Sequence, residues 1–143
     1  MKVAIVGGQN IYNTQLVKQA MSECAYPMED IVTTEDPGIA ACVREICEAD
    51  KIKFEVLYPD WSNLNIDKDK LEIRTDKNTG KKYNHRAAVN RNRLLTETCD
   101  AVVVIWDGRS RGVKDIIDHI PSGKSVWTTI VQPSVHTFDG EEE

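Results

Sequence analysis

Short, continuous runs of apolar residues recur along the chain and alternate with helical patterns. Five such runs, rich in β-branched residues, predict strands at residues 3–6, 30–34, 54–57, 101–106 and 125–131. Because the apolar positions within a run are consecutive and do not alternate with polar ones, we expect strands that are covered on both faces. This pattern is typical of a parallel sheet.

Apolar positions at helical spacing lie between most of these strands. The first pattern runs from Ile11 to Met21, and the second has Asp36 as a predicted N-cap before Pro37 and the stripe Ile39, Val43, Ile46 and Cys47. Two more helices are predicted at residues 89–99 and 113–120. Strands that alternate with helices form right-handed βαβ units, so the predicted fold class is α/β, a Rossmann-like open parallel sheet of about five strands with flanking helices.

A polar insertion at about residues 62–84 interrupts this alternation. Its two short extended halves surround Asn78-Thr79-Gly80, which favours a β-hairpin. Insertions of this length are commonly functional lids or mobile segments, and both interpretations stay open. We expect one Rossmann-like domain over residues 1–136 and an acidic, disordered tail over residues 137–143.

Composition places the chain among globular proteins. Of its 143 residues, 41% are hydrophobic and 29% are charged, and no apolar run approaches the roughly 20 residues of a membrane span. The first apolar run is too short for a signal peptide, so we expect a cytoplasmic protein that has no membrane partner. The four cysteines form no CxxC pair and the three histidines are scattered, which favours buried, reduced thiols and no metal site.

The charge distribution bears on nucleic-acid binding. The formal net charge is -5, and four of the negative charges lie in the C-terminal tail, so the rest of the chain carries about -1. Broad binding to nucleic acid needs a continuous basic face, so a nucleic-acid partner is not expected.

Polar and glycine-rich segments follow the predicted strands. Ligands of open α/β sheets bind beyond the carboxyl ends of the strands, where helix N-termini also point. We therefore expect four segments to form a ligand-binding site. Their candidate ligand-binding residues are Gly7, Gly8, Gln9 and Asn10; Trp61, next to Asp60; Arg86, Asn90, Arg91 and Asn92; and Asp107, Gly108, Ser110 and Gly112.

Each segment also has a purely structural interpretation. The glycine pair could be a tight turn, Trp61 a core side chain beside a capping aspartate, the arginines solvated, and the last segment a capped helix with exposed Arg109 and Arg111. Arg91 and Asn92 offer a planar donor fork and a carboxamide, which suit a phosphate or the edges of a base and a ribose. We expect Arg91→Ala to abolish ligand binding with little change in thermal stability.

Several of these motifs carry a family resemblance. The stretches "KVAIVGGQN", "YPDW", "AAVNRN" and "CDAVVVIWDGRSRGVKDII" resemble the DUF2493 family of the SLOG superfamily, Rossmann-like proteins related to LOG enzymes and to the DprA domain. The resemblance covers most of the chain and implies binding of a nucleotide or nucleotide-derived signal. It also implies a homo-oligomer, and its occurrence in bacteria and phages suits a sensor or sequestering role.

One loop departs from the family pattern. The family has a glycine-rich GGAxGxD loop after the second strand, whereas this chain has "TTEDPGIAA". Glu35 and Asp36 bring negative charge where the family holds phosphate, and Ala40 stands where its aspartate falls. This change puts the usual phosphate position in doubt, together with any catalysis that needs the missing acid.

These observations leave several functions open. The first is a binding protein, without a cofactor, for a nucleotide or nucleotide-derived molecule. The second is a nucleoside N-glycosidase or deoxyribosyltransferase-like enzyme, whose candidate catalytic residues are Asp60 and Asp107, with Glu35 as a third carboxylate. A single-stranded nucleic-acid binder that uses Trp61, Arg86, Arg91 and Arg109, and a structural domain that has lost its ligand, are the remaining alternatives.

Overall fold

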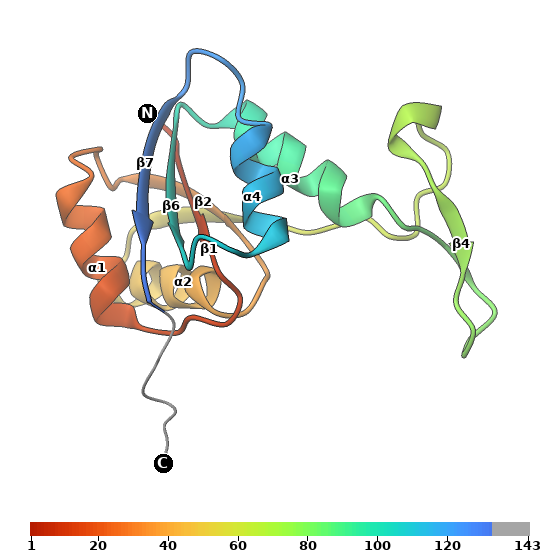
Figure 1. Ribbon diagram of the computed structural model, residues 1–143, viewed down its shortest axis with the longest axis horizontal. Coiled ribbons are helices and arrows are strands. Elements are labelled where there is room, and N and C mark those ends of the chain that lie inside the picture. The colour runs from red at the N-terminus through yellow and green to blue at the C-terminus, as the bar shows by residue number, and fades with distance from the viewer. Residues whose placement is uncertain (133–143) are drawn as a thin grey trace.

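A five-stranded parallel sheet forms the centre of the molecule (Figure 1). The computed structural model describes residues 1–132. The strand order is β3-β2-β1-β6-β7, with bounds β1 Val3–Gly7, β2 Asp30–Thr34, β3 Lys53–Leu57, β6 Ala101–Trp106 and β7 Ser125–Ile130. All four pairings in this sheet are parallel. The predicted α/β, Rossmann-like class is therefore confirmed.

Two helices cover each face of the sheet. Helices α1 (Thr14–Glu23) and α2 (Ile39–Asp50) pack on one face, and α3 (Ala87–Thr98) and α4 (Arg111–Asp118) pack on the other. Alternate residues of β6 enter the two cores: Val103 and Ile105 face α1 and α2, while Val102 and Val104 face α3 and α4. This double burial explains why β1, β2 and β6 are almost continuously apolar.

The two edge strands are less covered than the sequence predicts. We expected every strand to be covered on both faces, which holds for the central strands but is wrong for β3 and β7, in which exposed and partly buried residues largely alternate. Val126 and Ile130 of β7 are exposed although they belong to an apolar run. An apolar run indicates a strand, but it does not tell how many neighbours cover that strand.

The predicted N-cap of the second helix is also wrong. Gly38 (φ 78°) is the N-cap, and the helix begins at Ile39. The helix does not extend back through Gly38 because the φ of this residue is not helical, and the guanidinium of Arg44 donates to the main-chain carbonyls of Thr34 (2.6 Å) and Asp36 (3.0 Å) in the segment before it. The other helices shift by a few residues from their predicted bounds: α1 begins only at Thr14, α3 begins at Ala87, and α4 covers Arg111–Asp118.

The predicted hairpin insertion is confirmed. After β3 the chain forms a short 3-10 turn, η1 (Lys68–Lys70), and then the antiparallel strands β4 (Ile73–Thr75) and β5 (Lys82–Asn84), which project away from the sheet beyond the start of α3 (Figure 1). A role as a lid stays a prediction. The predicted tail, residues 137–143, lies outside the described residues.

Asn84 fixes the base of the hairpin. Its side chain is 1% exposed, accepts hydrogen bonds from the main-chain N–H groups of Glu72 (3.0 Å) and Arg86 (3.0 Å), and donates to the carbonyl of Lys70 (2.9 Å). A buried carboxamide with both of its ends bonded ties the segment before β4 to the segment after β5. The hairpin therefore leaves the domain in a defined direction.

All four cysteines are buried and free. Burial raises the pKa of the Cys47 thiol to about 11. Within residues 1–132, no helix is long and apolar enough to cross a membrane, and no group of three or more His, Cys, Asp or Glu side chains could hold a metal ion.

Candidate functional site

A cavity of about 440 Å³, called here the edge cavity, lies at the carboxyl edge of the sheet. Loops that follow β1, β2 and β3 contribute to it, together with helices α3 and α4. Its lining comprises Gln9, Glu35, Asp36, Pro59, Trp61, Ala88, Val89, Arg91, Asn92, Arg111, Gly112 and Asp115. The chain runs outward from β1 to β3 and returns beside β1 as β6, so this edge includes the topological switch point at which open α/β sheets bind ligands.

Two carboxylates after β2 meet Arg91 from α3 at this cavity. The Arg91 guanidinium is paired with Glu35 and, at 3.2 Å, with Asp36, and Arg91 is only 7% exposed. The Thr34 hydroxyl donates to the same Asp36 carboxylate (2.8 Å). The charge of the acidic loop is therefore partly compensated, the loop is held in place, and Arg91 is its internal ion-pair partner. The expectation that its loss would leave stability unchanged does not fit this burial, and we now expect the opposite.

The edge cavity also contains groups suited to a base. Trp61 is 44% exposed, so its interpretation as a core side chain is wrong, and its ring packs edge-on against Tyr83 with centroids 6.3 Å apart. Asn92 adds a carboxamide, which accepts a hydrogen bond from Nε of Arg91 (3.1 Å) and leaves its amide group for another acceptor.

The glycines after β1 serve internal packing. A Cβ on Gly7 would lie 2.0 Å from the carbonyl oxygen of Ile105, and one on Gly38 would lie 2.3 Å from that of Gly8. The Gly8 carbonyl also accepts the first main-chain N–H of α2, from Ile39, at 3.1 Å. The loop after β1 thus occupies the N-terminus of α2, and a ligand-binding role for Gly7 and Gly8 stays a prediction.

Asp107 organises the turn after β6. Its carboxylate accepts hydrogen bonds from the main-chain N–H groups of Arg109 (2.8 Å) and Ser110 (3.0 Å), and these bonds lower the pKa of Asp107. A carboxylate that holds its own turn is poorly placed to act as a general acid. Asp107 does not line the edge cavity.

Asp115 brings a third carboxylate to the edge cavity from α4. Arg93 binds it with two hydrogen bonds of 3.0 and 3.3 Å, and this contact lowers the pKa of Asp115, with smaller contributions from His119 and Arg86. Arg111, at the start of α4, has no ion-pair partner within residues 1–132. Two arginines and three carboxylates therefore line this cavity.

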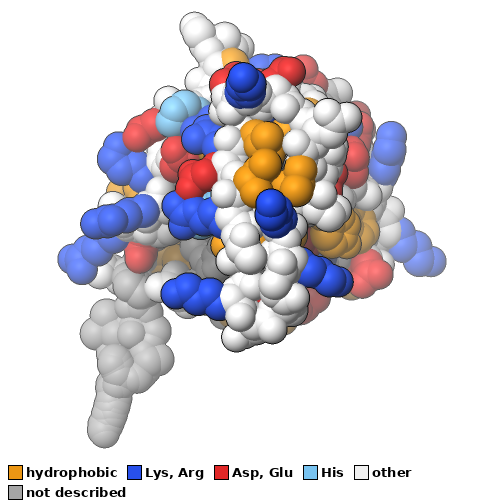
Figure 2. Space-filling view, turned by 90° about the vertical axis from the view of Figure 1, so that its right-hand side faces the viewer, with side chains coloured by type: hydrophobic (Ala, Val, Ile, Leu, Met, Phe, Trp, Pro, Cys, Tyr) orange, Lys and Arg blue, Asp and Glu red, His pale blue; other side chains and the backbone are white. Residues whose placement is uncertain are grey.

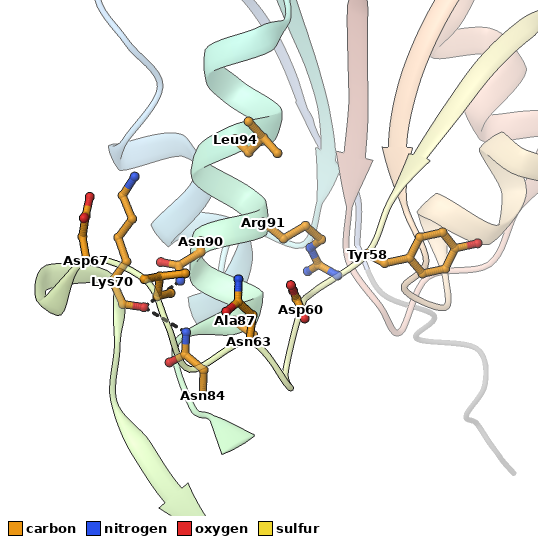
Figure 3. A pocket seen from close by; sticks show the side chains of 11 residues that line it. Tyr58, Asp60, Asn63, Asp67, Lys70, Asn84, Ala87, Asn90, Arg91 and Leu94 are labelled. Carbon is orange, nitrogen blue, oxygen red and sulfur yellow. Dashed lines mark hydrogen bonds between the residues drawn. The ribbon is translucent and has the colours of Figure 1, made fainter. Parts of the chain in front are cut away.

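A second cavity of about 410 Å³, the α3 cavity, lies between α3 and the base of the hairpin (Figure 3). Arg91 lines both cavities, and here its side chain extends toward Asp60 and Tyr58. On the opposite side, Asn90 donates to the Lys70 carbonyl (2.8 Å), which also accepts from Asn84. The Asn90 amide therefore supports the insertion.

The structure brings together part of the predicted site. Five candidates line the edge cavity: Gln9, Trp61, Arg91, Asn92 and Gly112. Asp60 and Asn90 line the α3 cavity. Neither cavity is lined by the other candidates, which are Gly7, Gly8, Asn10, Arg86, Asp107, Gly108 and Ser110.

Sequence reasoning did not foresee Asp115 or Tyr58 as lining residues. Asp115 lies one helical turn after the start of α4, and its i, i+3 spacing from Gly112 was the available signal. Tyr58 directly follows β3, so the strand-end rule that selected Asp60 and Trp61 applied to it as well.

Comparisons with family models, with curated proteins and with solved structures give no match to this chain.

Proposed function

We propose that this chain binds a nucleoside or a nucleotide-derived small molecule in the edge cavity and acts as a sensor or sequestering protein. The observation that carries the proposal is the pair of carboxylates that follows β2, held by Arg91 and Thr34. In dinucleotide-binding α/β folds, an acidic residue downstream of the first glycine turn accepts a hydrogen bond from a ribose hydroxyl. Glu35 and Asp36 are suitably placed acceptors for such a sugar.

The charge of the loop favours a sugar over a phosphate at this position. Both carboxylates line the cavity and share a single arginine as their ionic partner, so one negative charge of the pair is left uncompensated. A phosphate placed there would meet like charge, whereas a neutral diol would donate to anionic acceptors. The family resemblance supports the same ligand class, with its usual phosphate position displaced.

Trp61 and Asn92 provide the complementary contacts for a base. An exposed indole face stacks on any nucleobase, and the free amide group of Asn92 can donate to a base or ribose oxygen. Stacking of this kind contributes about 1–3 kcal/mol per base. The two residues enter the cavity from different elements, so a ligand between them would join the segment after β3 to α3.

The placement of the acids favours binding without conversion. The Asp107 carboxylate accepts hydrogen bonds from the main chain of its own turn, and Asp60 lines the α3 cavity. Glu35 alone of the three candidate catalytic carboxylates lines the edge cavity, and it is paired with Arg91. The glycosidase alternative stays a prediction.

Calorimetric titration with a panel of nucleosides tests the proposal. At least one nucleoside should bind the purified chain, and Trp61→Ala should weaken that binding about tenfold through lost stacking. Tyr58→Ala is the matched control, because Tyr58 is 68% exposed and lines the α3 cavity instead. Absence of binding to every nucleoside and nucleotide at millimolar concentration would refute the proposal.

Incubation with the bound ligand separates binding from catalysis. Chromatography after prolonged incubation should recover the intact molecule. A released free base would support the N-glycosidase, and the dependence of its release on Glu35→Gln would identify the acid.

We also propose that the chain works in the cytoplasm as a homo-oligomer. Four free, buried cysteines suit a reducing compartment. Sedimentation velocity at micromolar concentration should give a mass of two or more times 16.1 kDa, and a mass of 16.1 kDa would refute the oligomer.

A further inference from the structure

A third cavity, of about 460 Å³, lies on the hairpin and is called here the hairpin cavity. Trp61 and Tyr83 supply its aromatic lining, and Lys81 and Lys82 supply its positive charge. The view onto the side of the molecule from which the hairpin projects shows Lys and Arg side chains interspersed with Asp and Glu (Figure 2).

Trp61 lines both the hairpin cavity and the edge cavity. Its position is fixed from the hairpin side, because its carbonyl accepts a hydrogen bond from the main-chain N–H of Asn84 (2.8 Å) and its ring packs edge-on against Tyr83. The ring of Tyr83 in turn packs edge-on against His85, with centroids 6.3 Å apart. A ligand that stacks on Trp61 in the edge cavity therefore lies next to the hairpin cavity.

The two cavities differ in charge. Lys81 and Lys82 have no ion-pair partner within residues 1–132, and they outnumber the one carboxylate that lines the hairpin cavity, Asp76, whose Oδ1 accepts hydrogen bonds from the main-chain N–H groups of Asn78 (2.7 Å) and Thr79 (3.2 Å). The edge cavity, in contrast, has more carboxylates than arginines. Two adjacent cavities of opposite charge suit a ligand with one neutral and one anionic end.

We propose that the hairpin cavity binds the phosphate-bearing end of the ligand whose nucleoside part lies in the edge cavity. This inference rests on the proposed function and names its ligand class as a nucleotide. The phosphate is held by lysines of the insertion and not by the loop after β2, where Glu35 and Asp36 stand. The insertion is thus the anion-binding half of the site.

Paired titrations with a nucleoside and its 5′-mono- and 5′-diphosphates test this assignment at low salt. The wild-type chain should bind the phosphorylated forms about tenfold more tightly than the nucleoside, because each exposed lysine adds a charge-assisted contact. The double variant Lys81→Gln/Lys82→Gln should lose that preference and keep the affinity for the nucleoside. The preference should also shrink as salt is raised.

Lys77→Gln is the matched control, because Lys77 lies at the hairpin tip and does not line the hairpin cavity. It should retain the phosphate preference, and circular dichroism should show the same melting curve for all three proteins. A wild-type chain that binds nucleosides with no phosphate preference would overturn the inference and leave the proposed function standing. A preference that persists in the double variant would also overturn it, by placing the phosphate elsewhere.

Two further outcomes are distinct from these. Absence of binding to both nucleosides and nucleotides would overturn the proposed function and this inference with it. Binding of single-stranded oligonucleotides but not of mononucleotides, lost in the double variant, would overturn the inference in favour of a nucleic-acid surface.

Discussion

Arg91→Ala should destabilise the fold, because it leaves two carboxylates without their cationic partner. Arg91 and Asp36 are 3.2 Å apart, which corresponds to an attraction of about 5 kcal/mol at an effective dielectric constant of 20 and about 1 kcal/mol in water. The side chains of Glu35 and Asp36 are 34% and 23% exposed, so solvent screens part of this attraction. We expect a net loss of about 2–4 kcal/mol, below the upper end of values for fully buried pairs.

Urea denaturation followed by circular dichroism measures this loss. With a typical dependence on urea for a chain of this size, the midpoint should fall by about 1–2 M. Arg111→Ala is the control, because Arg111 is exposed and has no ion-pair partner in residues 1–132, and it should change stability by less than about 0.5 kcal/mol.

A double-mutant cycle separates the ion pairs from the packing of the arginine side chain. If the carboxylates cause the loss, Glu35→Gln and Asp36→Asn in the Arg91→Ala background should restore part of the stability, and the effects should be far from additive. An Arg91→Ala midpoint within error of that of Arg111→Ala would refute this reasoning, and so would strict additivity.

Three further predictions concern the loops, the acid side of the stability curve and the thiols. Gly38→Ala should lower the free energy of unfolding, measured by urea denaturation, by more than about 2 kcal/mol, because the new Cβ would lie 2.3 Å from a main-chain atom. Gly80→Ala is the control, because Gly80 has a similar positive φ but lies in open space, and it should cost about 1 kcal/mol. Equal losses would show that crowding at Gly38 is irrelevant. The contact with Arg93 lowers the pKa of Asp115 below its unfolded value, so the ionised Asp115 stabilises the fold fully at neutral pH, and this stabilisation is lost as the pH falls through the folded pKa. Asp115→Asn should therefore flatten the decline in Tm below about pH 4. An unchanged decline would contradict this prediction. Cys47 is buried and its pKa is raised to about 11, so its thiol should not react with a thiol reagent at pH 8 in the native chain and should react only on unfolding. The absorbance of the chromophore that the reagent releases measures this reaction. Rapid labelling of Cys47 in the native chain would show that it is not buried.

The sheet could be predicted from sequence because its central strands are buried on both faces and therefore form continuous apolar runs. The same signal failed at the edges: Val126 and Ile130 belong to an apolar run, yet they are 44% and 65% exposed. The start of α2 could not be predicted, because the groups that hold Asp36 out of the helix include Arg91, 55 residues away. A local capping pattern does not contain that partner.

The candidate site was predictable to the extent that it depends on strand ends. The rule that ligands bind beyond the carboxyl ends of parallel strands placed Gln9, Trp61 and Gly112 at one cavity. It could not show that Arg91 is already paired, or that Lys81 and Lys82 flank the same tryptophan. Those facts depend on where a helix face and a hairpin point, which only tertiary packing determines.

The attachment of the hairpin through Asn84 makes the insertion an exchangeable module. Its anchoring hydrogen bonds lie at the root, on the main chain of Lys70, Glu72 and Arg86. The turn at the tip has hydrogen bonds of its own, which the Asp76 carboxylate accepts from the main-chain N–H groups that follow it. Root and tip therefore obey separate sequence requirements. Related chains could change the length and charge of the tip, and with them the kind of molecule recognised, while the root and the sheet behind it stay the same.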